Sequence, residues 1–256
     1  NNNDARRLFS VLSHNSKKYG ESASYYLAYM DFQEGNYNQA VAVFRQLKDK
    51  AEYREPSTFF LIQSLYLQGK TGETISEGKD YINNYPSSKN VAEIYRLLGS
   101  SYYKQGDMTN AASNYQEYMK TAESPFREDM YQLGDAYYRL ASYSNAIGAL
   151  KQVASSGDQL GQTASMLLGQ SYLKINDTAN ALLSFDAAAR AEFDPKVSEE
   201  ALFNYVMLQN NSNVNAFGQS ITASQRFLTA YPNSQYSDKV NSVLATTLLS
   251  TKNYNE

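Results

Sequence analysis

The chain of 256 residues contains no cysteine, no tryptophan and a single histidine, His14. The missing cysteine excludes disulfides, thiolate metal sites and a thiol nucleophile. With no cysteine and a single histidine, a nitrogen- or sulfur-rich zinc site and a Ser-His-Asp relay are both disfavoured. We therefore predict that the protein is not an enzyme and that it carries no cofactor and no metal.

Long apolar runs and an excess of basic residues are also missing. No run approaches the roughly 18 apolar residues of a membrane span, so we predict no transmembrane segment in this chain. Lysine and arginine number 23 against 26 aspartates and glutamates, a net charge of -3. Nucleic-acid binders usually concentrate positive charge, and this balance predicts no nucleic-acid partner.

What the sequence does contain is a repeat with a spacing of 35 residues. Leucine, glycine, tyrosine and alanine each recur three times in this register. They are Leu98, Leu133, Leu168, Gly99, Gly134, Gly169, Tyr102, Tyr137, Tyr172, Ala111, Ala146 and Ala181. A shared register of this kind is typical of repeat arrays, in which each repeat presents the same faces to its two neighbours.

Within one repeat the pattern is that of two amphipathic helices. In residues 92–125, Leu98, Gly99 and Tyr102 lie on one face of a first helix, and a Gly106-Asp107 turn leads to a second helix that contains Ala111. We expect Gly99 to be small because two helices approach closely there. The predicted fold is all-α: a right-handed superhelical α-solenoid of antiparallel helix pairs.

The pattern covers the chain as a single array of about six repeats with a partial repeat at each end. The predicted boundaries are 5–19 (partial), 21–54, 57–88, 92–125, 127–160, 162–195, 199–232 and 238–256 (partial, containing Tyr254). Ser124-Pro125 and Asp194-Pro195 are predicted helix starts, each an N-cap acceptor before a proline. An Asn-rich run, 210–215, lengthens one inter-helix loop. Both ends cut through a repeat, which predicts an excerpt of a longer array.

The sequence Leu-Gly-x-x-Tyr, a Gly-Asp or Gly-Asn turn, Ala-x-x-x-aromatic and a closing proline resembles the tetratricopeptide repeat. The resemblance implies a scaffold that binds a protein or peptide. Family members that grip chaperone carboxylate tails use Lys and Asn side chains, but the matching first-helix positions here offer only one basic residue, Arg96. A chaperone-tail ligand is therefore disfavoured.

Two five-residue segments are similar to segments of bacterial envelope tetratricopeptide proteins. They are Asn84-Tyr85-Pro86-Ser87-Ser88 and Ala230-Tyr231-Pro232-Asn233-Ser234. This narrower resemblance implies a periplasmic or outer-membrane location. A cytoplasmic location is the alternative.

In such arrays the first helices line the concave side, and the candidate binding residues are those that point from these helices away from the core. They form a Tyr-rich groove suited to an extended peptide or an amphipathic helix. The predicted groove residues are Tyr25, Tyr29, Phe59, Gln63, Tyr66, Arg96, Ser100, Tyr103, Tyr131, Asp135, Tyr138 and Gln170.

Other interpretations stay open at this point. The tyrosines could simply pack their rings against neighbouring helices while their hydroxyls stay hydrated. The array could instead act as a structural spacer, or self-associate through exposed ends. RNA binding is disfavoured by the acidic charge balance, although RNA-binding helical repeats share the 35-residue period.

Overall fold

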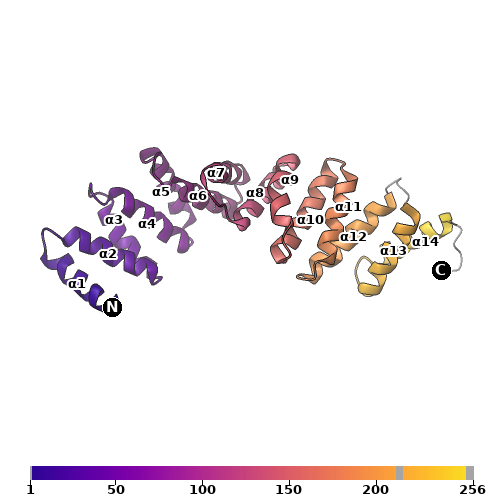
Figure 1. Ribbon diagram of the computed structural model, residues 1–256, viewed down its shortest axis with the longest axis horizontal. Helices are drawn as coiled ribbons and strands as arrows, with labels where there is room; N and C mark the ends of the chain where they lie inside the picture. Colours follow the sequence, from indigo (N-terminus) through magenta and orange to yellow (C-terminus); the bar gives the residue numbers. More distant parts are fainter. Residues whose placement is uncertain (1, 212–215, 252–256) are drawn as a thin grey trace. The chain divides into compact units, whose positions relative to one another are not determined.

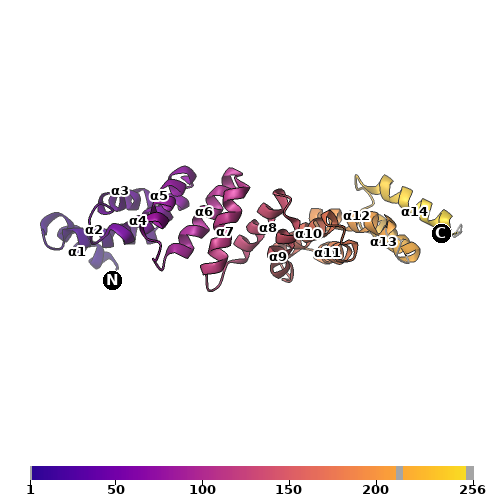
Figure 2. The same cartoon turned by 90° about the horizontal axis from the view of Figure 1, so that it is seen from above.

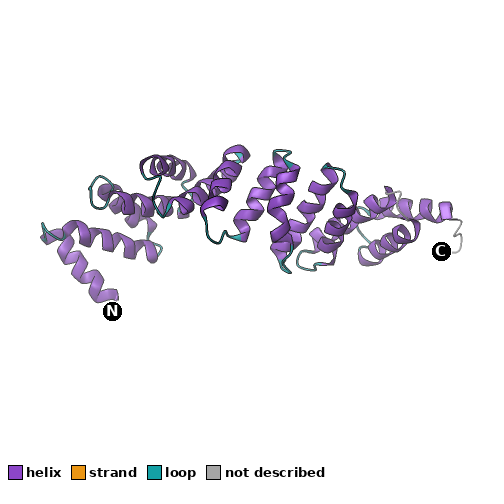
Figure 3. Cartoon of the chain, turned by 45° about the horizontal axis from the view of Figure 1, so that its top comes forward, coloured by secondary structure: helices purple, strands orange, loops and turns teal. Residues whose placement is uncertain are grey.

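The computed structural model describes residues 2–211 and 216–251. In these residues the regular secondary structure is entirely helical, with fourteen α-helices and no strand (Figure 3). The predicted all-α repeat fold is confirmed. Tyr254 and most of the Asn-rich run, residues 212–215, lie outside the described part of the chain.

The helices fall into two compact units, Asn1–Pro125 (unit 1) and Phe126–Glu256 (unit 2). The boundary between them coincides with the predicted boundary between the repeats 92–125 and 127–160. Unit 1 contains α1 Asn2–Asn15, α2 Gly20–Gln33, α3 Tyr37–Leu47, α4 Arg54–Leu67, α5 Thr71–Asn84, α6 Val91–Gln105 and α7 Met108–Thr121 (Figure 1). Unit 2 contains α8 Arg127–Arg139, α9 Tyr143–Ala154, α10 Gln159–Lys174, α11 Thr178–Arg190, α12 Pro195–Asn211, α13 Ala216–Ala230 and α14 Ser237–Thr251.

Each unit has an inner and an outer layer of helices. The first helices of successive repeats touch each other: α2 contacts α4 and α4 contacts α6 in unit 1, and α8, α10, α12 and α14 form the same succession in unit 2. Among the described residues, successive second helices make no such contact. Within each unit the helices follow one another in chain order (Figure 2). The first helices therefore form the inner layer, because neighbouring elements approach most closely on the inside of a curve.

The repeated glycines bring the two helices of each pair together. A Cβ atom on Gly134 of α8 would lie 2.6 Å from Leu150 Cγ of α9, and one on Gly99 of α6 would lie 2.8 Å from Tyr115 Cδ1 of α7. Gly169 of α10 is related in the same way to Phe185 of α11. In all three pairs the large side chain is buried and stands sixteen residues after the glycine. The expectation that Gly99 is small for close packing is confirmed.

The turns inside the helix pairs keep one residue in the left-handed region. Gly35, Gly69 and Gly106 have φ values of +72° to +81°, and Ala141 and Asn176 hold the same place with φ of 55° and 60°. A side chain costs about 1–2 kcal/mol in this conformation, less for asparagine, whose polar side chain bonds locally. Ala141 is exposed, so its methyl group makes few contacts that would offset the strain.

We expect Ala141→Gly to stabilise unit 2 by about 0.5–1 kcal/mol, because relief of backbone strain exceeds the added flexibility of the unfolded chain. Urea and thermal unfolding followed by circular dichroism would measure the change. Asn176→Gly is the matched control, and we expect a smaller effect there. A destabilised Ala141→Gly variant would contradict this explanation of the turn.

One of the two predicted Pro helix starts is confirmed and the other is wrong. α12 begins at Pro195, and the Asp194 carboxylate accepts hydrogen bonds from the N–H groups of Lys196 and Val197 at 2.9 and 3.4 Å. α8, by contrast, begins at Arg127 after an extended Phe126, two residues beyond Pro125. The first turn of α8 carries Glu128 and Asp129, whose charges favour a helix N-terminus.

The two segments that contain Tyr85-Pro86 and Tyr231-Pro232 fold into the same turn. The Ser88 N–H donates to Tyr85 O at 3.0 Å, and the Ser234 N–H donates to Tyr231 O at 3.1 Å. In each turn the serine Oγ then accepts the N–H of the residue two positions later, at 3.1 and 3.0 Å. First helices α6 and α14 follow, as the sequence predicts.

Candidate functional site

The inner layer of unit 1 carries eight of the twelve predicted groove residues. We call this surface the first-helix face of unit 1. α2 contributes Tyr25 and Tyr29, α4 contributes Phe59, Gln63 and Tyr66, and α6 contributes Arg96, Ser100 and Tyr103. Ser100 is buried and the other seven are half-buried. The aromatic rings of this face are therefore partly embedded and partly accessible.

At the N-terminal end of this face the rings form a connected cluster around Phe60. Tyr25 and Tyr29 both contact the Phe60 ring, with centroids 6.4 and 5.0 Å apart, and Tyr25 also packs against Phe44 at 5.9 Å. Burial raises the pKa of Tyr25 to about 12, with a smaller contribution from the neighbouring tyrosines. Tyr25 therefore stays neutral at physiological pH, and the cluster fixes the orientation of both tyrosines.

The middle of the face is joined across repeats by a hydrogen bond. Tyr66 Oη of α4 lies 2.9 Å from Ser100 Oγ of α6, a contact between two predicted groove residues. The ammonium of Lys104 also lies over the Tyr66 ring, 4.2 Å from the ring centroid. Buried Ser100 thus serves to position Tyr66 and offers no open contact surface of its own.

Arg96 is paired within its own helix. Its Nε and one Nη donate to the two carboxylate oxygens of Glu93, both at 2.7 Å. This bidentate pair neutralises the guanidinium. The Arg96 guanidinium is therefore already engaged by a carboxylate of its own helix.

The remaining predicted residues lie on first helices of unit 2. Tyr131, Asp135 and Tyr138 are on α8 and Gln170 is on α10. Asp135 is buried and pairs with Arg139 at 2.7 Å, so it presents no open contact. Burial raises the pKa of Tyr131, and the Asp135 charge adds to the shift. Tyr138 packs edge-on against Tyr143, with centroids 5.6 Å apart, and Gln170 is half-buried.

Two residues belong to these faces that the sequence prediction missed. Lys104 covers the Tyr66 ring, and Leu173 of α10, 41% exposed, stands 35 residues after Tyr138. The 35-residue spacing identifies Leu173 without a structure. Lys104 is marked by the same spacing, because the basic residues Arg139 and Lys174 stand 35 and 70 residues after it.

The described residues contain no group of three or more His, Cys, Asp or Glu side chains placed to hold a metal ion. In the same part of the chain, every helix is too short or too polar to cross a bilayer. The first-helix faces present aromatic rings, hydroxyls and a few charged groups.

This architecture defines an α-solenoid repeat protein. Residues 131–195 match the family model described as tetratricopeptide repeat, and residues 17–128, most of unit 1, match the model described as YfiO, outer membrane lipoprotein. The resemblance to the tetratricopeptide repeat that the sequence indicates is therefore confirmed.

Solved structures show the same fold at low sequence identity. The C-terminal part of a tetratricopeptide repeat-containing protein from Cytophaga hutchinsonii is 14% identical, with 93% of this chain and 95% of that chain covered and a TM-score of 0.61. PilF from Pseudomonas aeruginosa is 13% identical, with 87% and 96% covered and a TM-score of 0.50. A chain of the Naa15/Naa10 complex bound to HypK-THB is 14% identical, with 91% and 34% covered and a TM-score of 0.61. No curated protein sequence matches the chain.

Proposed function

We propose that this protein is a non-enzymatic scaffold that holds a partner protein or peptide against the first-helix face of unit 1, within a bacterial envelope assembly. The observation that carries the proposal is the row of half-buried aromatic rings, Tyr25, Tyr29, Phe59, Tyr66 and Tyr103, on successive inner helices.

The aromatic rings of this face are held in place before a partner binds. Tyr25 and Tyr29 are fixed against Phe60, and Tyr66 is held by Ser100 and Lys104. Ordering a side chain on binding costs about 0.5–1.5 kcal/mol, and rings that are already fixed avoid most of this cost. Tyrosine also supplies a large apolar contact together with a hydrogen-bonding tip. Such a face suits an extended peptide or one side of an amphipathic helix.

The envelope location is supported by two observations. The outer membrane lipoprotein model matches residues 17–128, which include the first-helix face of unit 1. Both Tyr-Pro turns, which resemble those of envelope tetratricopeptide proteins, form the same hydrogen-bonded structure.

We expect the double variant Tyr66→Ala, Tyr103→Ala to reduce capture of the partner by at least about tenfold, because truncated aromatic contacts at interface centres typically cost 2 kcal/mol or more. The measurement is affinity capture from solubilised bacterial envelope with the full chain as bait. Tyr138→Ala, on unit 2, tests whether that unit contributes.

Tyr19→Ala is the matched control, since Tyr19 is 51% exposed and precedes α2 outside the face. We expect it to leave capture unchanged. Circular dichroism would establish that every variant is folded. Full capture by the folded double variant would remove the first-helix face from the function.

A further inference from the structure

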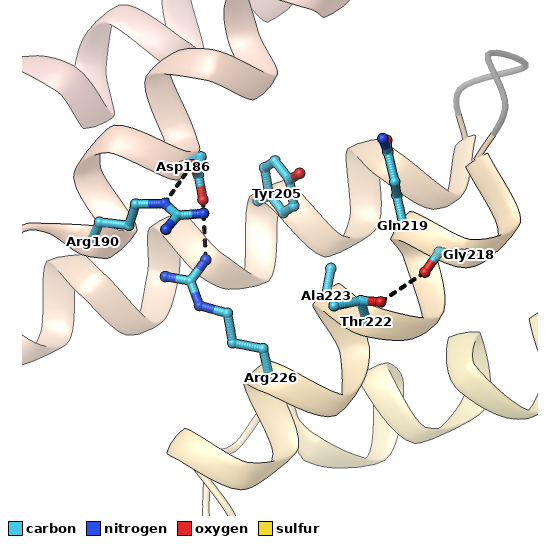
Figure 4. Close-up of a pocket in the computed structure, with 8 residues that line it drawn as sticks. All are labelled: Asp186, Arg190, Tyr205, Gly218, Gln219, Thr222, Ala223 and Arg226. Carbon is cyan, nitrogen blue, oxygen red and sulfur yellow. Dashed lines mark hydrogen bonds and ion pairs between the residues drawn. The ribbon is translucent and has the colours of Figure 1, made fainter.

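A second concave site lies on the opposite, second-helix side of unit 2 (Figure 4). It is a pocket of about 590 Å³ in the gap between α11 and α13, with Tyr205 of α12 at its floor. This volume is within the range of about 300–1,000 Å³ that is usual for small-ligand sites. The pocket is independent of the first-helix face of unit 1.

One end of the pocket holds two arginines that share one aspartate. Arg190 Nε donates to Asp186 Oδ2 at 2.6 Å, and Arg226 Nη1 donates to Asp186 Oδ1 at 3.0 Å. The group carries one surplus positive charge. Unit 2 as a whole is acidic, with twelve acidic and nine basic residues in positions 126–256. The arginine end of the pocket is therefore a local positive site on a negative body.

Both guanidinium groups retain donors. Each has five N–H groups, and the bond to Asp186 uses one of them. Among the described residues, neither arginine has another hydrogen-bonding partner. The side chains of Arg190 and Arg226 are 68% and 35% exposed. A planar oxyanion can therefore approach both from solvent and accept paired hydrogen bonds.

The opposite end of the pocket is built by the insertion in this repeat. In α11 the motif alanine, Ala181, is the fourth residue of the helix, whereas in α13 the equivalent Ala223 is the eighth. The extra turn, residues 216–219, contains Gly218 and Gln219, which line the pocket. Insertions in repeat proteins gather on one face, often a binding face.

Gln219 also provides a donor for a ligand. Its Oε1 accepts a hydrogen bond from Gln209, and its amide nitrogen has no partner among the described residues. The small residues Gly218 and Ala223 leave the space over Tyr205 open.

We propose that this pocket binds a carboxylate of a partner peptide between Arg190 and Arg226, with the neighbouring peptide residue over Tyr205 and its backbone near Gln219. The Arg190–Asp186–Arg226 group has one surplus positive charge, which matches the single negative charge of a carboxylate. A phosphate ester carries a charge of about −1.5 to −2 at pH 7 and matches it less well. The carboxylate belongs either to an acidic side chain or to a free C-terminus.

Titration of the intact, isotope-labelled chain with three short peptides tests the proposal by nuclear magnetic resonance. Acetyl-Phe-Glu-Ala-amide offers a side-chain carboxylate, acetyl-Ala-Ala-Phe offers a C-terminal one, and acetyl-Phe-Gln-Ala-amide is the neutral match. We expect at least one carboxylate peptide to shift the Arg190, Arg226, Tyr205 and Gln219 signals and to bind at least fivefold more tightly than the neutral peptide. The better of the two identifies the source of the carboxylate.

Arg190→Gln and Arg226→Gln should each reduce the affinity at least fivefold, whereas Lys196→Gln, an equal charge change on exposed α12 surface, should not. Equal binding of the neutral peptide, shifts confined to other residues, or displacement by inorganic phosphate at lower concentration than by the peptide would each overturn the proposal. The peptide comparison uses the unaltered chain, so it decides the matter even if an arginine variant fails to fold.

Discussion

Gly134→Ala should destabilise unit 2 by up to about 2 kcal/mol, because overpacking costs about 1–3 kcal/mol and the better helix propensity of alanine returns about 1 kcal/mol. The added methyl group would lie 2.6 Å from Leu150 Cγ and 2.7 Å from Leu150 Cδ2, and Leu150 is fully buried. Leu150 cannot move aside without disturbing the packing of α8 against α9. Overpacking therefore outweighs helix propensity at this position.

Gly148→Ala is the matched control, on the partner helix α9. A Cβ atom there would meet nothing within 4 Å, and the position is exposed. We expect stabilisation by up to about 1 kcal/mol. Urea unfolding of both variants gives the two changes with opposite signs. A stabilising effect of Gly134→Ala would contradict the packing role of the repeated glycines.

Gln162→Leu should cost unit 2 about 3–5 kcal/mol, a large effect for one substitution. Gln162 is 1% exposed, and its amide nitrogen lies 3.1 Å from Ala188 O and within hydrogen-bonding distance of Ala191 O, groups at the C-terminal end of α11. Its Oε1 accepts the Asp194 N–H at 2.7 Å. One side chain of α10 thus satisfies terminal backbone groups that helix α11 leaves unpaired. Leucine fills the space but removes the Gln162 bonds to Ala188 O and the Asp194 N–H, at about 1–3 kcal/mol for each buried group, whereas Ala191 O keeps a bond from Ser198 Oγ.

Gln159→Ala, one turn earlier on the exposed side of α10, should change stability by less than about 0.5 kcal/mol. Thermal unfolding of both variants makes the comparison. Hydrogen exchange would add the location, since Gln162→Leu should accelerate exchange in residues 191–198 first. If Gln162→Leu unfolds like the Gln159→Ala control, the amide does not fasten the α11–α12 connection.

The fold was predictable because its determinants repeat. The same small and large positions recur at a fixed spacing, and each repeat adds independent support for the helix pair. Gln162 was not predictable in this way, since it occurs once and its partners lie 26 to 36 residues further along the chain. The predicted helix start at Pro125 was wrong, although Ser124-Pro125 is a local signal for a helix start. The connection from α7 continues through an extended Phe126, and α8 begins at Arg127.

The sequence predicted which helices carry the candidate face, but not which of its side chains are buried. Helical spacing places the groove residues on the inner helices, but it does not separate open rings from buried polar groups. Ser100 and Asp135 are buried because each serves a neighbour, Tyr66 and Arg139 respectively. The pocket with Arg190 and Arg226 depends on the extra turn at the start of α13. In the sequence this turn is indicated only by the Asn-rich insertion before it, which does not predict a pocket.

The most direct test of the binding proposal is site-specific photo-crosslinking in bacterial envelope extract. A benzophenone amino acid would replace Tyr103 on the inner helix α6 in one chain and Gln116, exposed on the outer helix α7, in another. We expect a discrete crosslinked partner from position 103 and none from position 116. A partner crosslinked from position 116 alone would contradict it.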